Sequence, residues 1–252
     1  MNGVALVTGA GGRIGAAIAQ RLATAGHRIV VHYRASAEGA QATVGAIRGA
    51  GGEAVAVRAD LSNRRQRAGL IDKAAKAFGP LTVLVNNASE FVPDALADLD
   101  EALWDAHFSV HLEAPVFLAR DFAAQLPDDA SGNIINMIDE RVLHLSPAYF
   151  SYTLSKGALH LATTTMAQHL APRIRVNAIG PGPSVPEKGK SVAEWKKAID
   201  SLPLRRGATA AEIAEAVVFL IGAPAITGQM IALDGGRHID WSAKRAPTPR
   251  KP

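Results

Sequence analysis

The stretch that decides the fold is Val4-Ala5-Leu6-Val7-Thr8-Gly9-Ala10-Gly11-Gly12-Arg13-Ile14-Gly15. Its first four residues are apolar and predict a short buried strand. The glycines that follow predict a tight turn into a helix. Such a turn lets backbone N–H groups approach a pyrophosphate, whose charge the helix N-terminus stabilises. The stretch therefore predicts a dinucleotide site, with Gly9, Arg13 and Ile14 among the contacts.

Short apolar runs alternate with helical patterns along the rest of the chain. The runs are nearly continuous, as expected for parallel strands that are covered on both faces. Strand–helix alternation repeated this often predicts a doubly wound α/β domain with a seven-stranded parallel sheet, spanning residues 1–240. The expected strands are Val4–Val7, Arg28–His32, Glu53–Arg58, Leu81–Asn86, Gly132–Ile138, Arg173–Ala178 and Gln229–Leu233.

Two segments stand apart from this alternation. Residues 180–209 are rich in Pro, Gly and Lys, and a long irregular segment inside a compact domain is usually functional, so we expect a substrate loop. Residues 241–252 form a basic C-terminal tail whose four cations equal the net charge of +4, which leaves the rest formally neutral. We therefore expect no nucleic-acid-binding face. The tail cations are Lys244, Arg245, Arg250 and Lys251.

Composition excludes several classes of protein. The 252 residues include no cysteine, which rules out disulfides, thiolate metal sites and cysteine nucleophiles. No apolar run approaches the roughly 18 residues of a membrane span, and the start of the chain lacks the pattern of a secretory signal. We expect a cytoplasmic protein that needs neither a metal nor a membrane.

The end of the second strand distinguishes between the two nicotinamide cofactors. An NAD site usually has Asp or Glu there to hold the ribose 2′-hydroxyl. This chain has His32-Tyr33-Arg34-Ala35-Ser36 and no acid. Arg34 would attract a 2′-phosphate, with His32 and Ser36 as further donors and Tyr33 beside them. NADPH is favoured, and a solvated basic turn is the alternative.

Polar residues also follow the third and fourth strands. Asp60, next to Leu61, could accept a hydrogen bond from the adenine amino group or cap the next helix. Asn87 and Ala88 follow Asn86 at the end of the fourth strand, where the backbone would line the crevice beside the cofactor.

Tyr152 and Lys156 lie four residues apart and so project from one face of a helix. A phenol with an ordinary pKa of about 10 becomes a usable acid when a nearby ammonium stabilises its phenolate. The lysine could also hold the nicotinamide ribose. Asp139 follows the fifth strand, where side chains point toward the ligand crevice, although an Asp there could also cap a helix or a turn.

Motifs spread over the whole chain resemble the short-chain dehydrogenase/reductase family. The resemblance implies a Rossmann-like fold, hydride transfer from NAD(P)H and a homotetramer or dimer. It also implies cofactor contacts at Pro181, Gly182 and Ser184. The matching motifs are Thr8-Gly9 to Gly15, Asp60, Asn86-Asn87-Ala88, Tyr152-x-x-x-Lys156, Arg175-Val176-Asn177, Pro181-Gly182 and Asp234-Gly235-Gly236.

Three positions depart from the family pattern. Arg13 replaces the middle glycine of the loop and Asp139 replaces the catalytic serine, and both are similar to pteridine reductases. His111 replaces the asparagine of the catalytic tetrad. This third departure, with the ending Asp234-Gly235-Gly236-Arg237-His238, resembles bacterial dihydromonapterin reductases.

The segment Asn87-Ala88-Ser89-Glu90-Phe91 is also similar to pteridine reductases. The similarity implies that Ser89 contacts the cofactor and substrate and that Phe91 stacks on a pterin ring. Phe91 and the nicotinamide would then sandwich the flat ring, and Arg13 would reach both the pyrophosphate and the polar edge of the pterin.

Together these features predict an NADPH-dependent reductase that adds hydride to a C=N bond of a dihydropterin. Asp139, Tyr152 and Lys156 would deliver the proton. One alternative is a short-chain reductase of a ketone or 3-oxoacyl carbonyl. A second alternative, from another class, is an NADP-binding protein without catalysis, which the intact Tyr152/Lys156 pair argues against.

Overall fold

The computed structural model describes residues 3–186 and 191–240. Seven strands form one sheet in the order β3-β2-β1-β4-β5-β6-β7, and every neighbouring pair is parallel. The strands are β1 (Val4–Val7), β2 (Arg28–Tyr33), β3 (Ala54–Arg58), β4 (Leu81–Asn86), β5 (Gly132–Met137), β6 (Ile174–Pro181) and β7 (Met230–Leu233).

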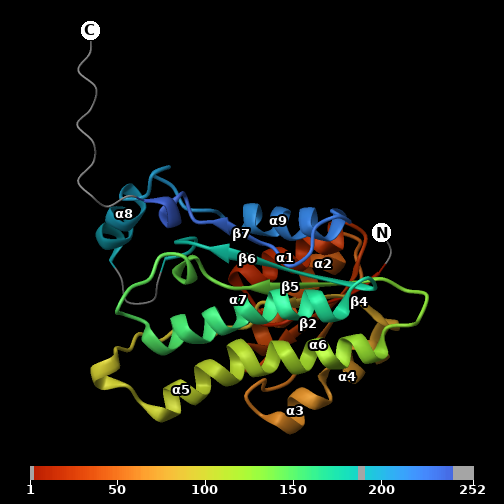
Figure 1. Cartoon of the computed structure of the whole chain (residues 1–252). Coiled ribbons are helices and arrows are strands. Elements are labelled where there is room, and N and C mark those ends of the chain that lie inside the picture. The colour runs from red at the N-terminus through yellow and green to blue at the C-terminus, as the bar shows by residue number, and fades with distance from the viewer. Residues whose placement is uncertain (1–2, 187–190, 241–252) are drawn as a thin grey trace.

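Helices cover both faces of this sheet (Figure 1). The α-helices are α1 (Arg13–Thr24), α2 (Ala37–Gly49), α3 (Arg64–Ala68), α4 (Leu70–Phe78), α5 (Glu101–Phe108), α6 (Ala114–Gln125), α7 (Phe150–Leu170), α8 (Val192–Asp200) and α9 (Ala210–Gly222). The shorter turns are the 3-10 turns η1 (Leu96–Asp98), η3 (Glu140–Val142) and η4 (Arg237–Ile239) and the π-helical turn η2 (Ser109–Glu113).

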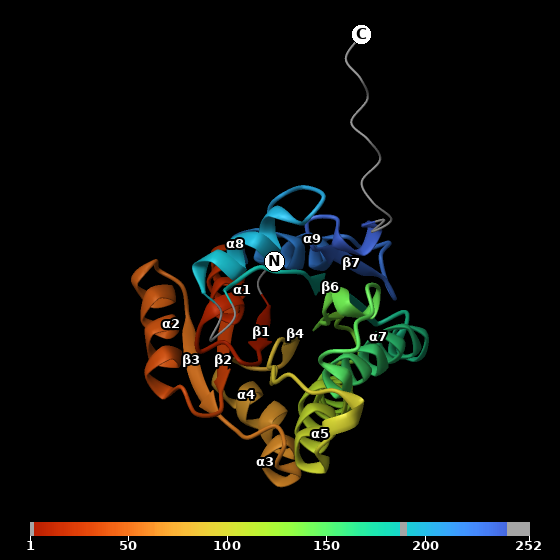
Figure 2. The same cartoon turned by 90° about the vertical axis from the view of Figure 1, so that its left-hand side faces the viewer.

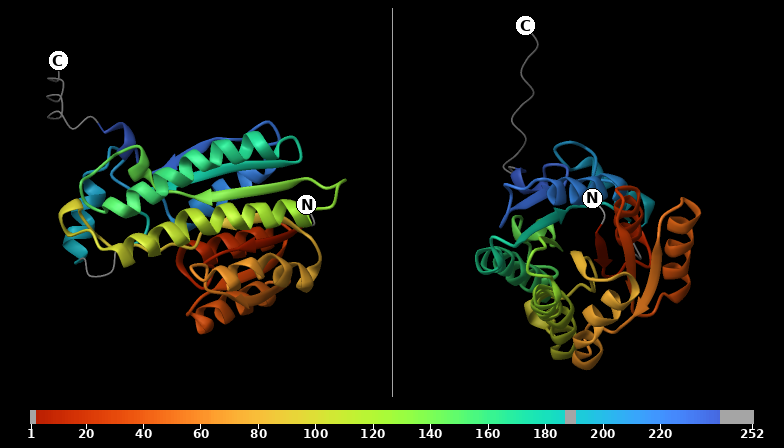
Figure 3. Two further views of the ribbon diagram at one scale, coloured as in Figure 1. Left: turned by 60° about the horizontal axis from the view of Figure 1, so that its bottom comes forward. Right: turned by 90° about the vertical axis from the view of Figure 1, so that its right-hand side faces the viewer.

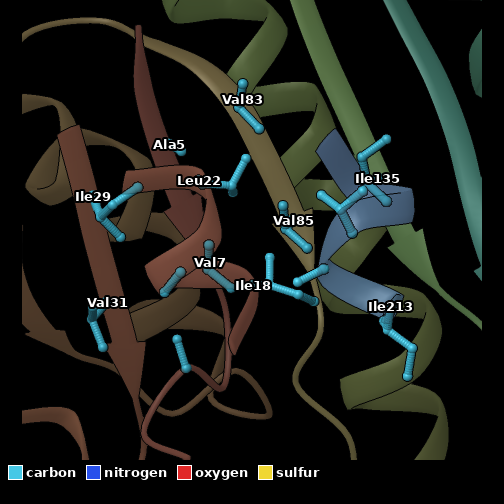
Figure 4. Packing of buried hydrophobic residues seen from close by; sticks show 14 of the residues in the cluster. Ala5, Val7, Ile18, Leu22, Ile29, Val31, Val83, Val85, Ile135 and Ile213 are labelled. Atoms are coloured by element: carbon cyan, nitrogen blue, oxygen red, sulfur yellow. The ribbon is translucent and has the colours of Figure 1, made fainter. Parts of the chain in front are cut away.

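Strand β1 shows why both faces are covered. Ala5 and Val7 point into one apolar cluster with residues of α1, α2 and α9, while Val4 and Leu6 point into a second with residues of α4, α6 and α7. All four β1 side chains are buried, which explains the uninterrupted apolar run. Figure 4 shows the first cluster, in which Ile18 and Ile213 pack onto the sheet.

The strand order places a ligand site at one edge of the sheet. Chain connections run outward in opposite directions from β1 and β4, and the carboxyl ends of these two neighbours mark the switch point at which doubly wound sheets bind ligands. Figure 2 looks onto this edge. The same edge carries the starts of α1 and α7, because each follows the carboxyl end of a strand.

Helices α5 and α6, joined through η2, form one long rod that lies beside α7 (Figures 1 and 3). Buried hydrogen bonds join the two, from His107 to Ser151 at 2.7 Å and from His111 to Ser155 at 2.8 Å. The rod therefore holds the helix on which Tyr152 and Lys156 stand.

The predicted seven-stranded parallel sheet is confirmed, with two local differences. Strand β6 continues to Pro181 because its last residues pair with β7. The expectation of a wholly irregular 180–209 segment is wrong, because helix α8 lies within it and begins with a capping box between Ser191 and Glu194. The basic tail, residues 241–252, lies outside the described residues.

Within the described ranges, no helix has the length and apolar character needed to cross a membrane. The same ranges contain no group of three or more His, Asp or Glu residues that could hold a metal ion.

Candidate active site

The glycine-rich turn is fastened to the end of β4. The Thr8 hydroxyl accepts hydrogen bonds from the backbone N–H groups of Asn87 and Ala88, and the Asn87 amide donates to the Thr8 carbonyl at 2.8 Å. At Gly15, a Cβ would lie 2.5 Å from both Asn87 Nδ2 and the Gly9 carbonyl oxygen. Only glycine fits there, so the turn is held close against β4.

Above the N-terminus of α1 the turn is open. A Cβ on Gly12 would meet no atom within 4 Å, and Gly12 makes no side-chain cap to the helix. The adjoining N–H groups at the positive end of α1 therefore fit a pyrophosphate. Arg13 begins the helix with φ of 52°, a left-handed conformation that glycine adopts more readily than other residues. Its side chain is exposed, and Ile14 packs against the core.

His32 has a different task from the one the sequence predicts. Its Nδ1 accepts from the Gly9 N–H at 3.1 Å and its Nε2 contacts the Ala59 carbonyl oxygen at 3.1 Å. The ring is buried, which lowers its pKa to about 4. A neutral ring with both nitrogens engaged cannot donate to a 2′-phosphate, so this expectation is wrong. His32 instead fixes the glycine turn.

Arg34 does lie at the surface after β2. Its guanidinium pairs with the Glu90 carboxylate at 3.3 Å, and the Arg34 side chain keeps 55% of its exposure. This pair joins the turn after β2 to the segment after β4. Its exposure makes it weak, so a doubly charged phosphate can replace Glu90 as the partner of Arg34.

The remaining adenosine-side candidates lie at the same edge. Tyr33 packs against the core, and Ser36 precedes α2 without a side-chain cap. The Asp60 carboxylate accepts from the backbone and the hydroxyl of Ser62, which lowers its pKa, while Leu61 is buried. The Asp60 side chain therefore shapes a turn, and its predicted adenine contact stays a prediction.

Asp139 and Tyr152 meet directly. The Tyr152 hydroxyl donates to Asp139 Oδ2 at 2.9 Å, and Asp139 Oδ1 accepts from the Arg141 backbone N–H at 2.9 Å. The Asp139 carboxyl therefore caps η3 with one oxygen and binds the Tyr152 phenol with the other. Burial raises the pKa of Asp139, against the lowering effect of Arg141.

Lys156 lies beneath this pair. Its Nζ donates to the Met137 carbonyl oxygen at 2.8 Å and lies 5.8 Å from the centre of the Tyr152 ring. Burial lowers the pKa of Lys156 to about 8, although Asp139 raises it. The structure thus brings the three predicted catalytic side chains together.

The expected lowering of the phenol pKa does not occur in this structure. Burial and then the Asp139 charge raise the pKa of Tyr152 well above its ordinary value, while the Arg141 charge lowers it. Because its hydroxyl faces a carboxylate and not an ammonium, Tyr152 is a neutral phenol over the physiological range.

Phe91 is a partly exposed ring that lies beside the buried Tyr152. Its ring stacks on Tyr149 at 4.5 Å and meets Tyr152 edge-on at 4.8 Å, and 38% of Phe91 is exposed. The Arg141 guanidinium lies over the Tyr149 and Phe91 rings. Ser89 precedes Phe91 and touches His111, with 3.0 Å between its Oγ and Nε2. The predicted stacking residue is therefore beside the predicted acid.

The residues after β6 complete the edge. The Gly182 N–H donates to the Leu233 carbonyl oxygen at 3.0 Å, and a Cβ on Gly182 would lie 2.6 Å from Asp234 Cα. The Ser184 hydroxyl donates to the Gly182 carbonyl oxygen at 2.9 Å, and Pro181 ends the strand. This part of the chain lies against the segment that follows β7.

Two carboxylates near the site, Asp94 and Glu140, were not predicted from the sequence. Asp94 accepts from the Ser151 N–H and caps the first turn of α7. Glu140 is buried beside Asp139, and its Oε1 pairs with Arg237 Nη1 at 3.3 Å. Burial raises the pKa of Glu140 to about 7. The only signal for Glu140 in the sequence was its place next to Asp139.

This edge, with a glycine turn at the switch point and a Tyr/Lys pair beside a carboxyl, defines a nucleotide-dependent oxidoreductase of the Rossmann type. Residues 9–238 match the family model described as enoyl-(acyl carrier protein) reductase. The chain belongs to the short-chain dehydrogenase/reductase family, whose members use NAD(H) or NADP(H).

Individual relatives are similar over nearly the whole chain. FolM alternative dihydrofolate reductase 1 from Brucella suis, solved in complex with NADP, has a TM-score of 0.92 and 46% identity and covers 95% of this chain and 96% of its own. An uncharacterized oxidoreductase of Methylorubrum extorquens is 39% identical over 92% of this chain and 96% of its own length. The 3-oxoacyl-[acyl-carrier-protein] reductase FabG of Staphylococcus epidermidis is 32% identical over 95% of this chain and 100% of its own length.

Proposed function

We propose that this protein is an NADPH-dependent reductase of a dihydropterin or dihydrofolate-type ring. The observation that carries the proposal is the 2.9 Å hydrogen bond from Tyr152 to Asp139, a carboxyl in the position where the family has serine. Further support comes from the 46% identity to a protein described as an alternative dihydrofolate reductase.

A carboxyl suits a C=N bond better than a serine hydroxyl does. Reduction of C=N adds hydride to carbon and needs a proton at nitrogen, whereas a carbonyl oxygen needs a neutral donor that stabilises developing charge. Burial raises the pKa of Asp139, and its carboxyl lies within hydrogen-bond distance of the Tyr152 hydroxyl, which suits it to exchange a proton with Tyr152. The reduced nicotinamide supplies the hydride when it is bound.

The proton then follows the hydrogen bond already present. Tyr152 gives its hydroxyl proton to the ring nitrogen, and protonated Asp139 restores that proton across the 2.9 Å contact. The Asp139 carboxylate takes up a proton from solvent before the next cycle. Lys156, fixed by the Met137 carbonyl, supplies the positive charge that keeps this transfer favourable.

Substrate recognition would come from the segment after β4 and from Arg13. Phe91 offers a partly exposed aromatic face beside Tyr152, and offset stacking suits a flat heterocycle. Arg13 is exposed at the start of α1 and makes no ion pair among the described residues, so its donors are available to a polar ring edge or to the pyrophosphate.

NADPH is the cofactor that the site fits. The turn from His32 to Ser36 has no acid to repel a 2′-phosphate, and Arg34 lies there with half its surface exposed. Gly9, Gly12 and Asn87 would line the pyrophosphate path.

A carbonyl reductase is the second candidate, favoured by the 32% identity to a 3-oxoacyl reductase over the whole of that relative. It requires a carbonyl to accept a proton from Tyr152 while Asp139 takes the place of serine. We also expect a homotetramer or dimer in the cytoplasm, as in the family resemblance. Size measurement by light scattering tests the assembly.

The experiment is NADPH oxidation, followed at 340 nm, with dihydrobiopterin, dihydromonapterin and dihydrofolate beside a panel of ketones and a 3-oxoacyl thioester. We expect turnover with at least one pterin and none with the carbonyl compounds. Turnover with carbonyls alone would favour the second candidate. NADPH binding without turnover on any substrate would favour a non-catalytic protein.

A further inference from the structure

Two histidines lie buried under the catalytic tyrosine. His107 ends α5 and His111 lies within the π-helical turn η2, and their rings stack 5.4 Å apart. Both meet the Tyr152 ring edge-on. His111 is 1% exposed, and burial lowers its pKa far below the ordinary value. π-Helical turns occur often at functional sites.

The contacts of His111 define its tautomer. Its Nε2 accepts from the Glu90 backbone N–H at 3.1 Å, and because that group can only donate, Nε2 carries no hydrogen. The neutral ring then has its hydrogen on Nδ1, which donates to Ser155 Oγ at 2.8 Å. Ser155 in turn donates to the Tyr152 carbonyl oxygen at 2.7 Å.

The same nitrogen also fixes Ser89. Its Oγ lies 3.0 Å from His111 Nε2, so the Ser89 hydroxyl and the Glu90 N–H share the single lone pair of this nitrogen. With the hydroxyl hydrogen directed toward His111, the lone pairs of Ser89 Oγ remain available as acceptors toward a ligand. His111 therefore joins the segment Ser89–Phe91 on one side to the catalytic helix on the other.

We propose that His111 is a positioning residue that sets substrate affinity by holding Ser89 and Glu90 against helix α7. The ring reaches both partners because its two nitrogens lie on opposite sides, Nδ1 toward Ser155 and Nε2 toward Glu90. The proposal rests on the proposed function, because that function assigns Ser89 and Phe91 to the substrate. Its consequence is specific: loss of the Nε2 contacts weakens substrate binding more than it slows the chemical step.

Two substitutions separate the contacts of this ring. In His111→Gln the side-chain carbonyl oxygen is two bonds from Cγ, as Nε2 is, so it can still accept from Glu90. In His111→Asn the polar atoms are one bond from Cγ, as Nδ1 is, so the contact with Ser155 is kept and those with Ser89 and Glu90 are lost. Each variant keeps a buried polar group of similar kind.

We expect His111→Asn to raise the KM for the dihydropterin about tenfold, because the Nε2 contacts with Ser89 and Glu90 are lost, with kcat changed less than threefold. His111→Gln should keep KM near that of the unchanged enzyme. Ser89→Ala combined with His111→Asn should raise KM by less than the product of the two single effects, because both variants lose the contact between Ser89 and His111. Equal KM for the Asn and Gln variants, or additive effects in the double variant, would overturn the proposal.

A second readout does not depend on the substrate. Hydrogen exchange of the Glu90 amide in the NADPH-bound protein should be about tenfold faster in His111→Asn than in His111→Gln. If no pterin is reduced by the unchanged enzyme, the proposed function fails while this measurement still tests the positioning role. Equal exchange in the two variants would refute it. Thermal unfolding checks that both variants are folded. Ser89→Ala is the matched control, because it leaves the Glu90 N–H contact with His111 intact and should not change Glu90 exchange.

Discussion

At the scale of single residues, Asp139 and Glu140 place two adjacent carboxyls at the end of β5 in different surroundings. Asp139 faces Tyr152 and receives a backbone N–H, whereas Glu140 is 2% exposed and has one oxygen, Oε2, without a hydrogen-bond partner among the described residues. The buried, unpartnered oxygen and the raised pKa of Glu140 indicate that this carboxyl, beside Asp139, makes the stability of the protein sensitive to pH.

We predict that Glu140→Gln removes a pH dependence of stability. The Glu140 pKa is raised from 4.5 to about 7 in the folded protein, so the folded state binds this proton more tightly. Protonation of Glu140 therefore adds roughly 3 kcal/mol to the free energy of unfolding below pH 4.5. This stabilisation is lost as the pH rises to about 7. Urea unfolding at pH 5 and 8 should show that the variant gains stability relative to the unchanged protein at pH 8. No change in the pH 5 to 8 difference would contradict the assignment.

Tyr152→Phe tests the proton donor. The variant retains the ring and its contacts with Phe91 and His111 but loses the hydroxyl that donates to Asp139. We expect kcat to fall at least about 100-fold, as for loss of a general acid, with the Kd for NADPH changed little. Stopped-flow turnover and fluorescence titration of NADPH measure the two quantities. Near-normal turnover would show that another group supplies the proton.

At the scale of elements, the cofactor site depends on how closely the glycine turn approaches β4. Gly15→Ala places a Cβ 2.5 Å from Asn87 Nδ2 and from the Gly9 carbonyl oxygen. We expect a loss of about 1–3 kcal/mol in stability and weaker NADPH binding. Gly45→Ala is the matched control, because a Cβ there in helix α2 meets no atom within 4 Å. It should be neutral or stabilising by up to about 1 kcal/mol. Similar losses in the two variants would show that crowding at β4 is not the cause.

The turn after β2 and the segment after β4 are joined by Arg34 and Glu90. Arg34→Ala should weaken the binding of NADPH at least about tenfold and change the binding of NADH little, because only NADPH carries the 2′-phosphate. Glu90→Gln should have the opposite effect and strengthen the binding of NADPH by up to about fivefold, since it removes a weak competitor for Arg34. Calorimetric titration with both cofactors measures these ratios. Equal losses for NADPH and NADH in Arg34→Ala would refute the phosphate role.

At the scale of the whole molecule, local patterns predicted the sheet and the glycine turn, and spacing predicted the Tyr152/Lys156 pair. Contacts between distant segments could not be predicted. Glu140 pairs with Arg237 across nearly a hundred residues, and His111 joins the end of β4 to α7. Burial, which depends on the whole fold, also decided charge states: it gave His32 a structural task and raised the Tyr152 pKa where spacing alone predicted a decrease.

The most direct test of the central claim is the rate of NADPH oxidation with a dihydropterin by Asp139→Ser, which restores the residue usual in the family. Tyr152, Lys156 and the cofactor contacts stay unchanged in this variant. We predict that pterin reduction falls at least about 100-fold while NADPH binding is retained, because the group that returns a proton to Tyr152 is removed. Pterin reduction at the rate of the unchanged enzyme would contradict the claim that Asp139 adapts this site to a C=N bond.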